Sequence, residues 1–133
     1  MNDTSAPAGP SLMKRLRRFV LLAVLALVVL GGLYTWAAWK YSYSEGERAG
    51  FVQKFSKKGW ICKTWEGELA MANYPGAIQQ VFHFTVWDDA VASQISQSMG
   101  ERVSIQYKQH VGLPTSCFGD TQYFVHAVRR VEN

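Results

Sequence analysis

The sequence predicts one membrane-spanning helix followed by a small, mainly-β domain. Residues 19–39 form a run of 21 residues without a charged side chain. As a helix rising about 1.5 Å per residue, this run covers the roughly 30 Å hydrocarbon core of a bilayer. Residues 41–133 instead show short aromatic and β-branched stretches in which apolar and polar positions alternate between turn residues. That pattern is typical of β-strands.

The membrane anchor is expected over residues 14–40. Basic residues are concentrated in residues 14–18, and aromatic residues gather at the far end of the apolar run around Trp39, where amphipathic rings favour the headgroup region. The alternative is a cleavable secretory signal, whose apolar core usually runs only about 7–15 residues. Residues 1–13 are rich in small residues and proline and are expected to form a disordered tail.

The charge distribution predicts an orientation and a set of partners. The amino-terminal basic cluster favours a cytoplasmic N-terminus, with the anchor in the inner (cytoplasmic) membrane and the domain outside the cytoplasm. In a Gram-negative cell that compartment is the periplasm. The whole chain has a formal net charge of +4 and a pI of about 9.2, but residues 41–133 hold nine Lys or Arg and nine Asp or Glu. A neutral domain lacks the main driving force for phosphate binding. The predicted partners are therefore membrane lipid, through residues 19–39, and an envelope protein, with no nucleic acid.

The first half of the domain is predicted to contain three strands. After a short linker at residues 44–50, the first strand is expected near residues 49–56, where bulky and polar residues alternate. The second is expected at residues 60–72, with Gly67 as a bulge or bend. The third is expected at residues 79–87, which are aromatic and β-branched.

The second half is predicted to contain a helix and two strands. Asp88 or Asp89 offers an N-cap, and Gly100 suits the position after the helix. Residues 102–110 alternate most cleanly, and residues 121–131 form the last strand. Three strands, a helix and two strands are the element order of an OB-like five-stranded barrel. The alternative is a small α+β antiparallel sheet with one covering helix.

Three short patterns resemble those of a known group of proteins. They are Y-S-x-G-x-R-x-G at residues 43–50, K-x-S-x-K-G at residues 54–59 and K-T-x-E-G-x-L at residues 63–69. The chain resembles small, uncharacterised single-span bacterial membrane proteins, some of which carry an automatic 6-phosphogluconate dehydrogenase label. The resemblance implies a bacterial envelope protein. It does not extend to the enzyme label, because the sequence contains no G-x-G-x-x-G motif after a strand.

Residues that could carry redox or metal chemistry are few. Cys62 and Cys117 are the only cysteines, and in an oxidising compartment they either pair or remain free. The histidines at positions 83, 110 and 126 match no zinc spacing, so no metal and no cofactor are predicted. No nucleophile motif is present, Glu66 and Glu68 are interpreted as a solvated strand face, and the chain is predicted not to be an enzyme.

Aromatic residues interleaved with basic ones give the main functional hypothesis. On an OB-like barrel such residues could line the face that binds extended ligands, or the rings could simply fill the core. The candidate binding residues are Trp60, Lys63, Trp65, Arg102, Tyr107 and Lys108. The predicted function is a membrane-anchored, non-enzymatic binding or structural module that contacts a protein partner or an envelope polymer. The alternative is a redox, metal or haem-handling accessory that uses the two cysteines and the histidines.

Overall fold

The computed structural model of the chain describes residues 9, 11–71 and 75–132. It divides into two compact units, residues 1–36 and residues 37–133. The predicted tail at residues 1–13 lies mostly outside the described residues.

The expected apolar helix is present as α1, Leu12–Lys40. It begins slightly before the predicted start, and the backbone N–H groups of Lys14 and Arg15 donate to the carbonyl oxygen of Ser11. No residue of α1 is buried, and its most apolar 18-residue window has a mean hydropathy of 2.3. By length and composition this is the one described helix able to cross a membrane.

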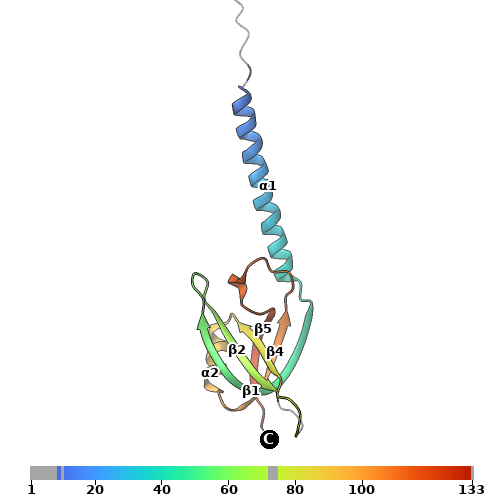
Figure 1. The fold of residues 1–133 in the computed structure, drawn as a ribbon, viewed down its shortest axis with the longest axis vertical. Helices are drawn as coiled ribbons and strands as arrows, with labels where there is room; N and C mark the ends of the chain where they lie inside the picture. Colours follow the sequence, from blue (N-terminus) through green and yellow to red (C-terminus); the bar gives the residue numbers. More distant parts are fainter. Residues whose placement is uncertain (1–8, 10, 72–74, 133) are drawn as a thin grey trace, which may run out of the picture. The chain divides into compact units, whose positions relative to one another are not determined.

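The second unit contains the predicted three strands, helix and two strands, in that order (Figure 1). Because a further 3₁₀ turn precedes the last strand, the connection there is longer than the others. The elements are β1 Ser44–Lys58, β2 Thr64–Met71, β3 Val81–Val86, α2 Asp89–Gln97, β4 Arg102–Gln109, η1 Ser116–Phe118 and β5 Tyr123–Arg130.

The five strands form one sheet in the order β1-β2-β3-β5-β4, and β4 pairs back with β1 to close a barrel. All neighbours are antiparallel except β3 and β5, which are parallel. That parallel contact consists of two pairs, Thr85 with Phe124 and Val86 with Val125. The seam between β3 and β5 is therefore the shortest ladder in the barrel.

The start of β1 corrects the prediction of a linker at residues 44–50. These residues belong to the strand and pair with β4, from Ser44 opposite Gln109 to Gly50 opposite Val103. From Gly50 to Lys58, β1 also pairs with β2, with a register shift between Val52 and Lys54. The long strand β1 thus pairs with β4 along its first half and with β2 along its second half, and this double pairing closes the barrel.

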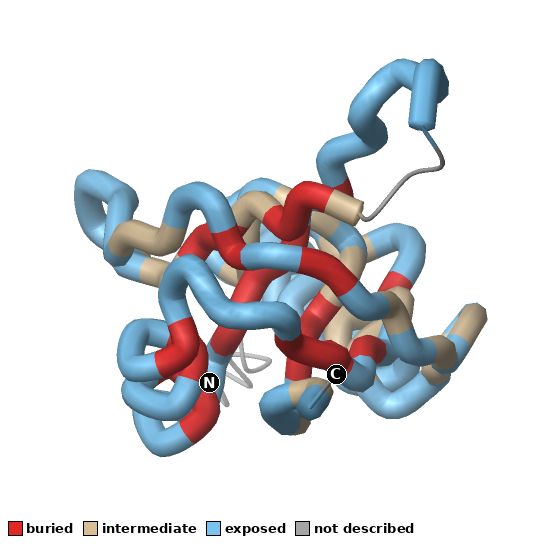
Figure 2. Tube along the Cα trace, turned by 90° about the horizontal axis from the view of Figure 1, so that it is seen from below, coloured by how far each residue is buried: buried red, intermediate tan, exposed pale blue. Residues whose placement is uncertain are grey.

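Alternating side chains supply the core, as predicted for β4. Val103 and Ile105 are fully buried and Tyr107 nearly so. From β2 and β3, Leu69 and Phe84 join them, and Figure 2 shows buried stretches of the trace, in red, interspersed with exposed ones. The other core members come from β1, β3, β5 and helix α2: Val52, Phe82, Val86, Val91, Ala92, Ile95 and Val125.

Helix α2 forms where its cap predicted it. The side chain of Asp88 accepts a hydrogen bond from the backbone N–H of Ala90 at 2.8 Å, and Gly100 has a positive φ of 80° just after the helix. Ile95 faces the barrel and is fully buried, because α2 packs against β1, β3 and β5.

Two expectations for β2 were wrong. The strand begins at Thr64, and residues 60–63 form part of the turn after β1. Of the bulge or bend predicted at Gly67, the bulge is absent, since the register of β2 with both neighbours is continuous there. A Cβ at Gly67 would lie 2.3 Å from Cζ of Phe84, so glycine is required because the Phe84 ring packs directly on the strand.

Candidate functional site

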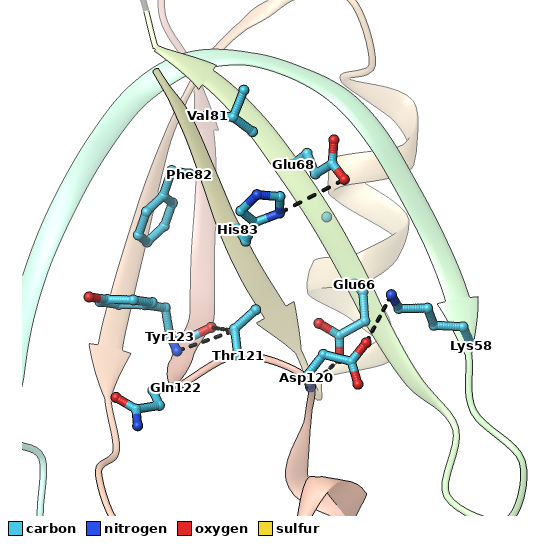
Figure 3. A pocket seen from close by; sticks show the side chains of 11 residues that line it. Lys58, Glu66, Glu68, Val81, Phe82, His83, Asp120, Thr121, Gln122 and Tyr123 are labelled. Carbon is cyan, nitrogen blue, oxygen red and sulfur yellow. Dashed lines mark hydrogen bonds and ion pairs between the residues drawn. The ribbon is translucent and has the colours of Figure 1, made fainter. Parts of the chain in front are cut away.

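A groove of about 640 Å³ lies on the outer side of β2 and β3 (Figure 3). One wall is formed by alternate side chains of the two strands, including Glu66, Glu68 and His83. The opposite wall is the segment that leads into β5, residues 120–123, and Lys58 from the end of β1 closes one end. The alternation that buries Leu69 and Phe84 also places these polar residues on the outside of the barrel.

Glu66 is held in this groove by several hydrogen bonds. Although it was predicted to be solvated, it is buried. Its carboxylate accepts hydrogen bonds from the hydroxyl of Thr64 at 2.6 Å, from the hydroxyl of Thr85 at 2.7 Å and from the backbone N–H of Asp120 at 3.1 Å. A buried carboxylate needs such donors to offset lost hydration. Glu66 therefore ties β2 to β3 and to the segment before β5.

Thr85 extends this network across the seam between β3 and β5. It is fully buried, and its hydroxyl oxygen lies 2.9 Å from that of Thr121. Gly119 packs over it, since a Cβ at Gly119 would lie 2.5 Å from Cγ2 of Thr85. Thr85 thus holds Glu66 and Thr121, two residues that line the groove, in place through hydrogen bonds.

The exposed charges of the groove are paired. Lys58 Nζ lies 2.8 Å from a carboxylate oxygen of Asp120, and this hydrogen bond raises the pKa of Lys58 above its usual value. Glu68 lies 3.8 Å from both Lys54 and His83. Among the groove's lining residues the carboxylates outnumber the lysines, so the groove favours ligand groups that carry positive charge or donate hydrogen bonds.

The groove also exposes part of a strand edge. Because the described ladder between β3 and β5 covers only Thr85 and Val86, residues 81–84 have a ladder partner on their β2 side alone. The Phe82 and Tyr123 rings meet edge to face at 4.9 Å beside this edge. An unpaired strand edge beside aromatic rings can accept an extended chain through backbone hydrogen bonds.

Near Lys58 and Asp120, beside the groove, the structure joins Cys62 and Cys117 in a disulfide with a Cα–Cα distance of 5.0 Å. Cys62 lies in the turn between β1 and β2, and Cys117 lies in η1. The bond thus fastens this turn to η1, which lies just before the groove wall at residues 120–123. No thiol in the chain is free.

The six predicted binding residues do not form one surface. Tyr107 points into the core, where its ring contacts Phe82 and Tyr123. Trp65 is half-buried, stacks on Phe55 and donates a hydrogen bond to Asp89. For these two rings the core-filling interpretation is the right one.

The other four candidates are exposed but separated. Trp60 and Lys63 lie in the turn between β1 and β2. Arg102 and Lys108 lie at opposite ends of β4, where Lys108 pairs with Glu45 at 3.4 Å. None of the six lines the groove. The sequence did not indicate the groove because Glu66 and Asp120 lie far apart in the chain. Only the order of the strands in the sheet brings them together.

The histidines are also apart. His83 is exposed in the groove, and His126 is exposed on β5. His110 is buried, stacked at 4.9 Å on Trp39, with Nδ1 3.2 Å from the carbonyl oxygen of Tyr41. Within residues 9, 11–71 and 75–132, no three His, Cys, Asp or Glu side chains are grouped to hold a metal ion.

These features define a small β-barrel with a polar groove on one outer face. The model of a family described as a domain of unknown function, DUF8785, matches residues 41–133. The chain therefore belongs to this family. No curated protein matches it significantly.

Two crystal structures of the mitochondrial single-stranded DNA-binding protein Rim1 from S. cerevisiae are similar in fold. The first form has a TM-score of 0.53 at 11% identity, covering 68% of this chain and 97% of that chain. The selenomethionine-labelled second form has a TM-score of 0.53 at 9% identity, covering 70% and 98%. At these identities the likeness concerns the fold.

This likeness corrects the exclusion of nucleic acid from the predicted partners. That exclusion rested on the equal numbers of acidic and basic residues in residues 41–133. The similar structures are of proteins that bind single-stranded DNA, so the fold itself is compatible with a nucleic-acid ligand. A formal count of charges was an insufficient reason to exclude this class, because stacking on aromatic rings also contributes to such binding.

Proposed function

We propose that this chain is a membrane-anchored binding module without enzymatic activity, and that α1 is its uncleaved anchor. In this proposal α1 spans the inner membrane of a bacterial cell once, with a cytoplasmic N-terminus and the barrel on the other side. The basic cluster before the apolar run supports this orientation. The Cys62–Cys117 disulfide also supports it, because structural disulfides persist outside the reducing cytoplasm.

The barrel is OB-like in this proposal. The strand order β1-β2-β3-β5-β4, the helix between β3 and β4, and the likeness to the Rim1 structures support the assignment. OB-folds bind extended ligands on the face of strands 2 and 3, between the loops after strands 1 and 4. The groove of this chain occupies the corresponding place, bounded by Lys58 and by residues 120–123.

The ligand proposed for this groove is an extended segment of a partner protein that carries basic side chains. The observation that carries the proposal is the free edge of β3 at residues 81–84, next to a groove rich in carboxylates. Backbone pairing with β3 would supply affinity, and Glu68 and Asp120 would select positive side chains. Single-stranded nucleic acid is the second candidate, favoured by the likeness to the Rim1 structures.

Site-specific photo-crosslinking in intact membranes tests the proposal. A photoreactive amino acid is placed at Gln122, in the groove wall, or at Gln106, an exposed residue of β4 that does not line the groove. We expect a discrete protein adduct from position 122 and none from position 106. An adduct with nucleic acid or with an envelope polymer would replace the proposed ligand class, and equal adducts from both positions would refute the groove as a binding site.

A charge reversal sharpens this experiment. We expect Glu68→Lys to lower the yield of the adduct from position 122 several-fold, because it places a positive charge where the ligand's basic side chain would lie. Glu45→Lys is the matched control, since Glu45 is also a strand glutamate with a lysine partner but lies outside this groove. Equal adduct yields from the two variants would contradict the role of Glu68.

A further inference from the structure

The turn between β1 and β2, residues 59–63, presents two large apolar side chains to solvent. The exposed fractions of Trp60 and Ile61 are 101% and 97%. Single exposed apolar residues are ordinary on a protein surface. Two adjacent, fully exposed apolar side chains at the tip of a turn form a protruding apolar surface that suits contact with a membrane or with another protein.

This turn is held in shape. Gly59 has a φ of 138°, and a Cβ there would lie 1.8 Å from the carbonyl oxygen of Cys62, so the backbone folds tightly on itself. Cys62 is in turn bonded to Cys117 in η1. Trp60 and Ile61 are therefore displayed on a constrained turn, which lowers the entropy cost of ordering them in a complex.

A chain of contacts within residues 37–133 connects this turn to the point where the chain enters the domain. Phe118, next to the disulfide, lies with its ring 5.6 Å from that of Trp39, and Trp39 also contacts Trp87 at 4.5 Å. Trp39 is the last residue of the uncharged run. Figure 1 shows the β1–β2 turn and η1 at the same end of the barrel.

The charged residues near the turn are mainly basic, which suits contact with an anionic lipid surface. No acidic residue occurs between Glu47 and Glu66, and Lys57, Lys58 and Lys63 flank the apolar pair. Lys58 is neutralised by Asp120, so the local excess comes from Lys57 and Lys63. Tryptophan beside lysine is the combination that favours the headgroup region of an anionic bilayer.

We propose that the β1–β2 turn is a second membrane contact, in which Trp60 and Ile61 enter the headgroup region of the bilayer that α1 spans. The inference rests on the proposed anchor. Two contacts with one bilayer, joined by the disulfide and by the ring contacts of Trp39 with Phe118 and Trp87, would restrict how the barrel rotates at the membrane. The groove would then keep a defined orientation toward its ligand.

Lipid photo-crosslinking tests this contact on the full chain. The chain is reconstituted in vesicles of radiolabelled phosphatidylcholine and phosphatidylglycerol, with p-benzoylphenylalanine in place of Trp60. The matched control carries the same probe in place of Ile78, which is 91% exposed and lies in the connection at the opposite end of β2. Flotation of the vesicles on a density gradient separately reports whether the protein is anchored.

We expect the chain to float with the vesicles and the probe at position 60 to form several-fold more lipid adduct than the probe at position 78. A chain that floats but gives equal lipid adducts from both positions overturns the second contact and leaves the anchor standing. A chain that does not float overturns the anchor, and the second contact with it.

Discussion

The double substitution Cys62→Ser with Cys117→Ser is expected to lower the free energy of unfolding of the domain by about 4 kcal/mol. The disulfide closes a loop with a sequence separation of 55, and constraining a loop of that length in the unfolded chain stabilises the folded state by about this amount on the chain-entropy model. The measurement is urea unfolding of the full chain in detergent micelles, followed by tryptophan fluorescence.

A reductant provides the control for this prediction. It should destabilise the unmodified chain by a similar amount and leave the double variant unchanged. If the double variant unfolds at the same urea concentration as the unmodified chain, the disulfide does not contribute to the stability of the barrel, and the constraint assigned to the β1–β2 turn is lost.

Removal of the Glu66 carboxylate is the second large effect. Glu66→Ala leaves the hydroxyls of Thr64 and Thr85 and the backbone N–H of Asp120 without their shared acceptor. Because hydrogen bonds to charged groups contribute more than neutral ones, we expect a loss of about 3 kcal/mol in the free energy of unfolding. Amide hydrogen exchange should also become faster in residues 119–122, which the carboxylate holds against β3.

Glu68→Ala is the matched control for Glu66→Ala. Both residues are glutamates on the outer side of β2, but the contacts of Glu68 are ion pairs at 3.8 Å with exposed partners. Such ion pairs contribute little to the free energy of unfolding. We expect its loss to change stability by less than about 1 kcal/mol. Equal effects of the two substitutions would show that the buried network of Glu66 does not stabilise the groove.

Local patterns predicted the parts of the fold that depend on neighbours in the sequence. The cap at Asp88 and the glycine at position 100 marked α2, and the alternation of residues 102–110 marked β4 with its buried face. Such patterns work because helix caps and strand pleats are set over a few residues.

The wrong predictions concern features that depend on contacts between segments distant in the sequence. Residues 44–50 resembled a linker because of their charges and glycines, yet Gly46 and Gly50 are needed for close packing against Tyr107 and against the backbone of Ala70. Trp65 was indistinguishable from a surface ring by composition, whereas the alternation of β4 already placed Tyr107 on the buried face. The groove itself is assembled from β2, β3 and residues 120–123, which only the strand order brings together.

Retention of helix α1 in the mature protein is the claim on which the proposed function and the second membrane contact both depend. The direct measurement is the intact mass of the polypeptide that remains in cell membranes after washing with alkaline carbonate. We predict a membrane-retained chain whose mass includes residues 14–40. A barrel released into the soluble fraction, with a mass that excludes those residues, would contradict it.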